Sequence, residues 1–184
     1  MKYCLLLLIF FSAKNVNSQA KDGIDEFIEM FKLRTKEVVG KPLPDFKATG
    51  LDGKIYTNQN IRGKATFVNF WFESCHPCIA EIPMLNRLYN LYKDTASFQF
   101  YAITFETKEN AERAMKKYNI QYPILLLSHD SAQVLNFKLG YPTNMILNKE
   151  GKISYITVGG SLDAKESDQM IEKYFIPELQ KLLK

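Results

Sequence analysis

The chain has 184 residues and a formal net charge of +4, and 46% of its residues are apolar. That length and apolar content suit one domain with a substantial core and a short appendage. With 24 basic and 20 acidic residues, the charge is too balanced to favour nucleic acid or an anionic membrane as a partner.

The first residues follow the order of a secretory signal peptide, which we place at residues 1–20. Lys2 supplies the positive start, Leu5–Phe11 form an unbroken apolar run, and the small residues Ser18 and Ala20 follow in a polar stretch. The run is shorter than the roughly 20 residues that span a membrane, so we expect no stable membrane insertion of the mature chain. A buried first helix is the alternative.

Removal of this signal would leave one pair of cysteines. Cys4 lies inside the apolar run and not at its end, where a bacterial lipoprotein cysteine would stand. The mature chain would keep Cys75 and Cys78, in a compartment where disulfides can form. We therefore expect a periplasmic or otherwise extracytoplasmic protein.

Residues 21–39 are predicted to be an N-terminal helical extension. From residue 22 the apolar residues recur at helical spacing, and those on one face are Ile24, Phe27, Ile28 and Phe31. Gly40–Pro44 then breaks the helix. Short strand-like pieces at 46–49 and 55–57 flank the turn signal Leu51–Lys54, which predicts a β-hairpin.

The chain is organised around the segment Thr66–Cys78. This segment begins as an apolar, β-branched and aromatic run, which predicts a buried strand, and it ends in Cys-x-x-Cys. After it, a helix is predicted by the apolar residues at 79, 82, 85, 89 and 92. Cys75 and Cys78 therefore lie where a core strand passes into a helix, close enough to bridge. Pro77 is tolerated in the first helical turn, and the positive helix N-terminus favours a thiolate.

The remainder of the chain alternates strands and helices. Strands are predicted at 98–105, 123–127, 144–147 and 152–158. Helices are predicted from Thr107 to Tyr118, from Asp130 or Ser131 to Phe137, and in a last segment whose inward residues are Ile171, Phe175, Leu179 and Leu182. Pro177 should kink or restart this last helix. The complete order predicts an α/β sandwich with a mixed sheet.

Several motifs occur in a fixed order along the chain. They are Gly40-Lys41-Pro42-Leu43-Pro44-Asp45-Phe46, Leu51-Asp52-Gly53-Lys54, Gly63-Lys64 before Val68-Asn69-Phe70-Trp71, Cys75-x-x-Cys78 with Glu81 and Pro83, Glu106 after the next strand, and Tyr141-Pro142-Thr143. With these motifs the chain resembles the TlpA/ResA-like branch of the thioredoxin-fold thiol–disulfide oxidoreductases. The resemblance implies a thioredoxin-like domain at 40–184, with a mixed central sheet flanked by helices and an N-terminal β-hairpin extension.

The resemblance also implies a role for each matching residue near the cysteines. Cys75 would be the exposed thiol that attacks a disulfide, and Cys78 would be the buried thiol that resolves the intermediate. His76 and Pro77 would tune the stability of the thiolate. This dipeptide departs from the Pro-Pro that is more usual in the branch.

On the substrate side, Pro142 would be a cis-proline that faces the cysteine pair, with Tyr141 contacting the substrate backbone and Trp71 forming part of the wall. Ordinary thioredoxins carry a buried aspartate where this chain has Asn69, and an amide cannot take a proton from the resolving thiol. Glu106 matches an acidic residue that this branch keeps near the site. We therefore expect Glu106 to be the base.

Simpler interpretations exist for these residues. The cysteine pair could be an inert structural disulfide, although a loop closed over so few residues stabilises little by chain entropy. His76 could be solvated, and Glu106 could be a surface charge at a strand end. We interpret Glu81 as a helix-face charge rather than a catalyst, and His129 as an exposed, idle side chain.

Other chemistries fit the sequence less well. A c-type haem site would need histidine after Cys78, where Ile79 stands, and structural zinc would need four ligands. A peroxidase would need a single activated cysteine, in a context that the residues before Cys75 do not supply. The main alternative is a thioredoxin-fold copper-delivery protein that uses both cysteines with His129, because soft thiolates bind Cu(I). We expect no metal and no cofactor.

Together the residues predict an exported, monomeric thiol–disulfide oxidoreductase that acts on protein thiol or disulfide substrates. Family analogy favours reduction of partner proteins, such as cytochrome c precursors, and a reductant needs an upstream thiol donor to regenerate its pair. Cysteine pairs of this type span roughly −270 to −120 mV, so both redox directions stay open on the sequence.

Overall fold

The computed structural model describes residues 29–30 and 32–184 of a chain that divides into two compact units, Met1–Glu37 and Val38–Lys184. In the first unit the described residues are helical. The predicted signal peptide, and the apolar positions 24, 27, 28 and 31 of the predicted first helix, lie outside the described residues. No helix among the described residues combines the length and apolar character needed to cross a membrane.

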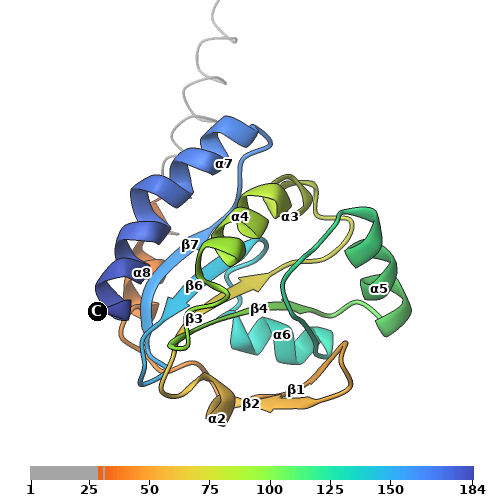
Figure 1. The fold of residues 1–184 in the computed structure, drawn as a ribbon, viewed down its shortest axis with the longest axis horizontal. Coiled ribbons are helices and arrows are strands. Elements are labelled where there is room, and N and C mark those ends of the chain that lie inside the picture. Colours follow the sequence, from red (N-terminus) through yellow and green to blue (C-terminus); the bar gives the residue numbers. More distant parts are fainter. Residues whose placement is uncertain (1–28, 31) are drawn as a thin grey trace, which may run out of the picture. The chain divides into compact units, whose positions relative to one another are not determined.

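In the described residues, the second unit forms a seven-stranded sheet in the order β2-β1-β5-β4-β3-β6-β7 (Figure 1). The strands are β1 Lys47–Gly50, β2 Ile55–Thr57, β3 Ala65–Phe70, β4 Phe98–Thr104, β5 Ile124–Leu126, β6 Thr143–Leu147 and β7 Ile153–Val158. The central strands β3, β4 and β5 are parallel, whereas every other pairing is antiparallel. The predicted mixed sheet and the predicted hairpin, β1–β2, are both confirmed.

The helices are α2 Asn58–Ile61, α3 His76–Ala80, α4 Ile82–Tyr92, α5 Lys108–Lys117, α6 His129–Leu135, α7 Ala164–Met170 and α8 Ile176–Leu183, with a π-helical turn η1, Ile171–Phe175, before α8. The single helix predicted after the cysteines is instead two helices, which meet at Glu81. Pro83 explains this break, since it has no N–H to donate to the carbonyl of Ile79. The predicted restart at Pro177 is confirmed, because α8 begins after η1 with Pro177 as its second residue.

The strand that leads to the cysteines is buried on both faces. All six residues of β3 are buried, and their side chains alternate between two apolar clusters. Phe67 packs in the cluster that contains both cysteines, together with Leu85 of α4. Val68 and Phe70 pack in the opposite cluster, together with Leu135 of α6. The core therefore fixes the strand end from which the site projects.

The two edges of the sheet are short or partly covered. Edge strand β2 has three residues and runs directly into α2, which the sequence does not predict and which Thr57 caps through its hydroxyl. At the other edge the segment 40–43 pairs with the chain entering β7. There Gly40 N donates to the Ile153 carbonyl at 2.7 Å, and Ile153 N donates to the Lys41 carbonyl at 2.9 Å. This segment thus covers the beginning of an otherwise open strand.

Candidate active site

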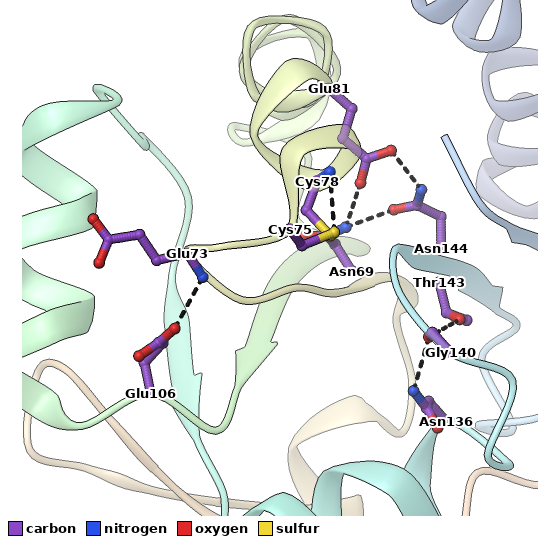
Figure 2. Close-up of a disulfide and its surroundings, with 10 residues drawn as sticks. All are labelled: Asn69, Glu73, Cys75, Cys78, Glu81, Glu106, Asn136, Gly140, Thr143 and Asn144. Atoms are coloured by element: carbon purple, nitrogen blue, oxygen red, sulfur yellow. Dashed lines mark hydrogen bonds between the residues drawn. A yellow bond between two sulfur atoms is a disulfide. The ribbon is translucent and has the colours of Figure 1, made fainter. Parts of the chain in front are cut away.

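The two cysteines form a disulfide at the point where β3 gives way to α3 (Figure 2). Cys75 is the N-cap of α3, and its Sγ accepts a hydrogen bond from the backbone N–H of Cys78 at 3.3 Å. Cys75 is 7% exposed and Cys78 only 1%, so the residue predicted to carry the exposed thiol is buried in this disulfide form and is the less buried of the two. Both cysteines belong to the core cluster that also contains Leu85 and Leu88 of α4, so the disulfide is packed into the domain and is not a cross-link at its surface.

Two prolines and a glycine meet beside the disulfide. The Tyr141–Pro142 peptide bond is cis, as predicted. A Cβ placed on Gly160 would lie 3.1 Å from Pro142 Cγ and 3.4 Å from Pro77 Cβ. Gly159 N also donates to the Pro142 carbonyl at 2.8 Å. The glycine loop therefore brings the proline of the Cys-x-x-Cys helix and the cis-proline to one place.

A buried carboxyl and two buried amides, Glu81, Asn69 and Asn144, form what we term the Glu81 group (Figure 2). Asn69 Nδ2 donates to Glu81 Oε1 at 2.8 Å, and Asn144 Nδ2 donates to Glu81 Oε2 at 3.1 Å. The two amides also bond to each other at 2.9 Å, because β3 and β6 place Asn69 directly opposite Asn144. The group ties the junction of α3 and α4 to β3 and β6.

Burial changes the acidity of Glu81. The side chain is 2% exposed, and this desolvation raises the pKa of Glu81 to about 8, although hydrogen bonds from Asn144 and Asn69 act in the opposite direction. The prediction of Glu81 as a helix-face charge is therefore wrong. The signal that could have located it is its spacing: Glu81 follows Cys78 by three residues, close to one helical turn, at the junction of α3 and α4.

Glu106 lies in a different group. It follows β4, and its Oε1 accepts a hydrogen bond from the backbone N–H of Glu73 at 2.9 Å, while Oε2 accepts from Asn110 Nδ2 at 3.3 Å. Figure 2 shows Glu106 beside the segment that precedes Cys75 and away from the three residues of the Glu81 group. Its action as a base toward Cys78 stays a prediction, and the hydrogen bonds show a contact with the active-site segment instead.

The remaining predicted residues differ in burial and in contacts. Trp71 is buried in the same cluster as both cysteines, and His76 is exposed. Tyr141 is half-buried, and its ring contacts the ring of Phe72 at a centroid distance of 5.2 Å. The exposed His129 lies edge-on to a neighbouring phenylalanine ring, as expected for a side chain at the surface.

A metal site is not assembled by the side chains that the structure describes. Within residues 29–30 and 32–184, no three histidine, cysteine or carboxylate side chains are grouped so that they could hold an ion. His129 begins α6, on an element remote in sequence from the cysteines. The copper alternative would thus have to rely on the two sulfurs alone.

The comparisons with known proteins agree with this geometry. The family model described as "AhpC/TSA family" matches residues 39–156. Over 152 residues the chain is 31% identical to the thiol-disulfide oxidoreductase ResA of Geobacillus thermodenitrificans, which covers 82% of this chain and 86% of that relative. The chain belongs to the AhpC/TSA family and is a ResA-like thiol–disulfide oxidoreductase.

Further relatives of this ResA-like oxidoreductase share its fold. The thioredoxin-like protein YneN of Bacillus subtilis is 31% identical over 137 residues, or 72% of this chain and 78% of YneN. The thioredoxin domain of a thiol-disulfide oxidoreductase from Bacteroides vulgatus superposes with a TM-score of 0.59 at 26% identity, covering 74% of this chain and 96% of that one. A thiol:disulfide interchange protein from Chlorobium tepidum superposes with a TM-score of 0.61 at 25% identity, covering 79% of this chain and 97% of that one. The thioredoxin-like fold and family predicted from the motifs are thereby confirmed.

Proposed function

We propose that this oxidoreductase reduces disulfides of partner proteins outside the cytoplasm, with Cys75 as the attacking thiol and Cys78 as the resolving thiol. The observation that carries the reducing direction is the Glu81 group. A buried carboxyl whose partners are two amides offers no positive charge to a neighbouring thiolate. The less the thiolates of a pair are stabilised, the more the pair favours the disulfide form and acts as a reductant. The Glu81 group adds no stabilisation to that which the start of α3 gives the Cys75 thiolate.

The proposed reaction assigns the attack to Cys75, the less buried of the two cysteines, and the resolution to Cys78. In the reduced enzyme the Cys75 thiolate attacks one sulfur of the partner disulfide, forms a mixed disulfide and releases the other partner sulfur as a thiolate, which takes up a proton. Cys78 then loses its proton and attacks Cys75 Sγ, which closes the intramolecular disulfide and releases the second partner thiol. The partner gains two electrons, and the enzyme loses them.

Glu81 is the proton acceptor that the structure favours for Cys78. Its pKa of about 8 lies close to the value of about 8.5 for a free cysteine, so a proton passes between the two groups with a small change in free energy. Glu81 follows Cys78 by three residues, at the junction of α3 and α4, and is buried from solvent. A buried acceptor is useful here because water has little access to the resolving thiol.

The surface around Cys75 supplies the binding site for the partner. We assign Tyr141, next to the cis peptide bond, to contact with an extended substrate backbone, and Trp71 to the wall of the site. His76 is exposed and Pro77 lies in the first turn of α3, where both can tune the Cys75 thiolate. The signal peptide at 1–20, the monomeric state and an upstream thiol donor complete the proposal.

Trapping of the mixed disulfide tests the two cysteine roles. Cys78→Ser should accumulate adducts between Cys75 and partner proteins on non-reducing gels, because the resolving thiol is absent. Cys75→Ser should accumulate none. Equal adducts in both variants, or none in either, would contradict the assignment.

The reduction potential of the pair tests the direction. We expect a value near the reducing end of the thioredoxin-like range, roughly −270 mV, measured by equilibration of the purified protein with glutathione or dithiothreitol buffers. A value near −120 mV, typical of a strong oxidant, would overturn the reducing direction and leave the cysteine roles intact.

A further inference from the structure

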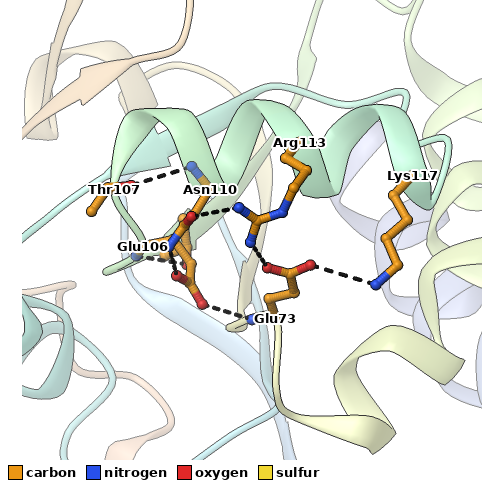
Figure 3. A network of polar contacts seen from close by, with 7 residues as sticks. Glu73, Glu106, Thr107, Asn110, Arg113 and Lys117 are labelled. Atoms are coloured by element: carbon orange, nitrogen blue, oxygen red, sulfur yellow. Dashed lines mark hydrogen bonds and ion pairs between the residues drawn. The ribbon is translucent and has the colours of Figure 1, made fainter.

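The segment between β3 and Cys75 is held at one residue, Glu73, by both its backbone and its side chain (Figure 3). The backbone N–H of Glu73 donates to Glu106 Oε1 at 2.9 Å. The carboxylate of Glu73 bonds to Arg113 Nη2 and lies 3.6 Å from Lys117 Nζ. Both cations belong to α5, so a helix that follows β4 anchors the segment that leads to the nucleophile.

The anchor is itself ordered by a second set of contacts on α5. Asn110 Nδ2 donates to Glu106 Oε2 at 3.3 Å, and Asn110 Oδ1 accepts from Arg113 Nη1 at 2.7 Å. Thr107 caps the helix by accepting from Asn110 N at 3.2 Å. We call Glu73, Glu106, Asn110, Arg113 and Lys117 the Glu73 network. Each of its members contacts at least one other member.

The burial of Glu73 distinguishes this network from an ordinary surface ion pair. The side chain of Glu73 is 19% exposed, whereas those of Arg113 and Lys117 are 57% and 58% exposed. The Arg113 hydrogen bond holds the pKa of Glu73 below its usual value, so the carboxylate is ionised at neutral pH. Because the carboxylate is mostly buried and both of its cationic partners come from α5, these contacts restrict the segment that carries Glu73.

We infer that Glu73 is a positioning residue for Cys75, acting through Arg113 of α5 and Glu106 of the β4 end. The inference rests on the proposed attack by Cys75. Glu73 precedes Cys75 by two residues, and the neighbouring Phe72 carbonyl accepts from Cys75 N at 3.2 Å. Fixing residue 73 therefore fixes the backbone that places Cys75 Sγ at the start of α3. None of these contacts involves sulfur, so they are available to the oxidised and the reduced enzyme alike.

A purely electrostatic role makes a different prediction from a positioning role. If the network acted on Cys75 only through charge, Glu73→Gln would leave two cations without their carboxylate, and Arg113→Gln would remove one positive charge and leave the carboxylate paired with Lys117 alone. The Cys75 pKa would then move in opposite directions, and the double variant would return toward wild type. If the network positions the segment, both single variants loosen it and slow the attack of Cys75 in the same direction.

The experiment measures the attack of reduced Cys75 on a small aromatic disulfide, as a function of pH, in wild type, Glu73→Gln, Arg113→Gln and the double variant. The fit separates the Cys75 pKa from the rate of the fully ionised thiolate. We expect the thiolate rate to fall about three- to tenfold in each single variant, and the double variant to be no slower than the slower single one, because one contact is lost in all three.

Glu112→Gln is the matched control. Glu112 forms the ion pair with Lys108 on the same helix α5, at 3.8 Å, and this pair has no contact with the active-site segment. Its thiolate rate should equal that of wild type. Opposite pKa shifts in Glu73→Gln and Arg113→Gln with unchanged thiolate rates would overturn the inference, as would a loss of rate in Glu112→Gln as large as in Glu73→Gln.

Cys75→Ser separates this inference from the proposed function. If Cys75→Ser still forms adducts with the disulfide reagent, the assignment of Cys75 fails. If Cys75→Ser is inert and the Glu73 and Arg113 variants match wild type in thiolate rate, the cysteine roles stand and only the positioning role is lost. Thermal unfolding of each variant, followed in parallel, shows that the rates compare folded proteins.

Discussion

The two carboxyl groups next to the cysteines, in the Glu81 group and in the Glu73 network, behave in opposite ways. Glu81 is enclosed by core and has amide partners, and its pKa is raised to about 8. Glu73 has a guanidinium and an ammonium as partners, and its pKa is lowered. The same type of side chain thus has a raised pKa in one place and a lowered pKa in the other. Proximity to the cysteines does not decide the role, whereas desolvation and the partner's charge do.

The largest effect should come from Glu81→Gln, which removes the proton acceptor and keeps the shape of the side chain. We expect resolution of a Cys75 mixed disulfide to slow by roughly 10²-fold, the lower end of the range for general-base catalysis. Single-turnover release of the partner thiol against pH measures it.

Glu106→Gln is the corresponding substitution in the Glu73 network. Its amide oxygen can still accept from Glu73 N, so we expect resolution to change by less than about tenfold. If Glu106→Gln slows resolution strongly and Glu81→Gln does not, the two roles must be exchanged, and Glu106 is the base after all.

A second consequence concerns stability against pH in the oxidised protein. The pKa of Glu81 rises from 4.5 to about 8 on folding, so the folded state holds its proton more tightly than the unfolded state. Below about pH 4.5 Glu81 is protonated in both the folded and the unfolded state, so burying it as an uncharged group does not lower the free energy of unfolding. Between pH 4.5 and 8 the free energy of unfolding should fall progressively, by on the order of a few kcal/mol.

Denaturant unfolding at pH 5 and pH 8 checks this sign. The loss between the two pH values should be smaller in Glu81→Gln than in wild type, because the amide does not titrate. An identical loss in both proteins would show that Glu81 is not the group responsible.

An intermediate effect is expected from Asn144→Ala, which removes one of the two hydrogen bonds that hold the pKa of Glu81 down. A hydrogen bond to a charged group contributes about 1.5–3 kcal/mol, equivalent to roughly one or two pKa units. The pH at which resolution reaches half its maximum should move upward by that amount. A midpoint that stays in place would indicate that Asn69 alone, or water, supports the carboxylate.

The smallest effect is expected from the Glu73 network on global stability. Arg113 and Lys117 are more than half exposed, and solvent and salt screen their attraction for Glu73. Glu73→Gln should lower the unfolding midpoint slightly at low salt, and the difference from wild type should vanish in 1 M salt. A large, salt-independent loss would mean that Glu73 supports the fold itself and not only the segment before Cys75.

The parts of the site that lie within one stretch of sequence were predictable. The apolar run of β3, the cysteine spacing and Pro77 specify a buried strand followed by a helix start, and the structure has both. Tyr141-Pro142-Thr143 was predictable as a cis-proline turn only through the family resemblance, and the cis bond is present. Local patterns suffice where a single element carries the chemistry.

The parts that depend on strand pairing were not predictable. Asn69 and Asn144 are 75 positions apart, and only the antiparallel register of β3 and β6 places both amides on Glu81. Glu106 and Glu73 are 33 positions apart, and their contact needs the end of β4 to lie beside the end of β3. The apolar spacing after Cys78 predicts one continuous helix and gives no sign of the break before Pro83. The break places Glu81 between two helices.

The segment that covers the beginning of β7 has a consequence for association between copies of the chain. An open strand edge can recruit another strand and start aggregation. Here residues 40–43 pair with residues 151–153, where the chain enters β7, and Pro42 and Pro44 have no N–H with which to extend the ladder outward. The opposite edge, β2, has three residues, too few to template a partner strand well. The covered start of β7 and the short β2 therefore limit the free backbone groups with which another copy of the chain could pair.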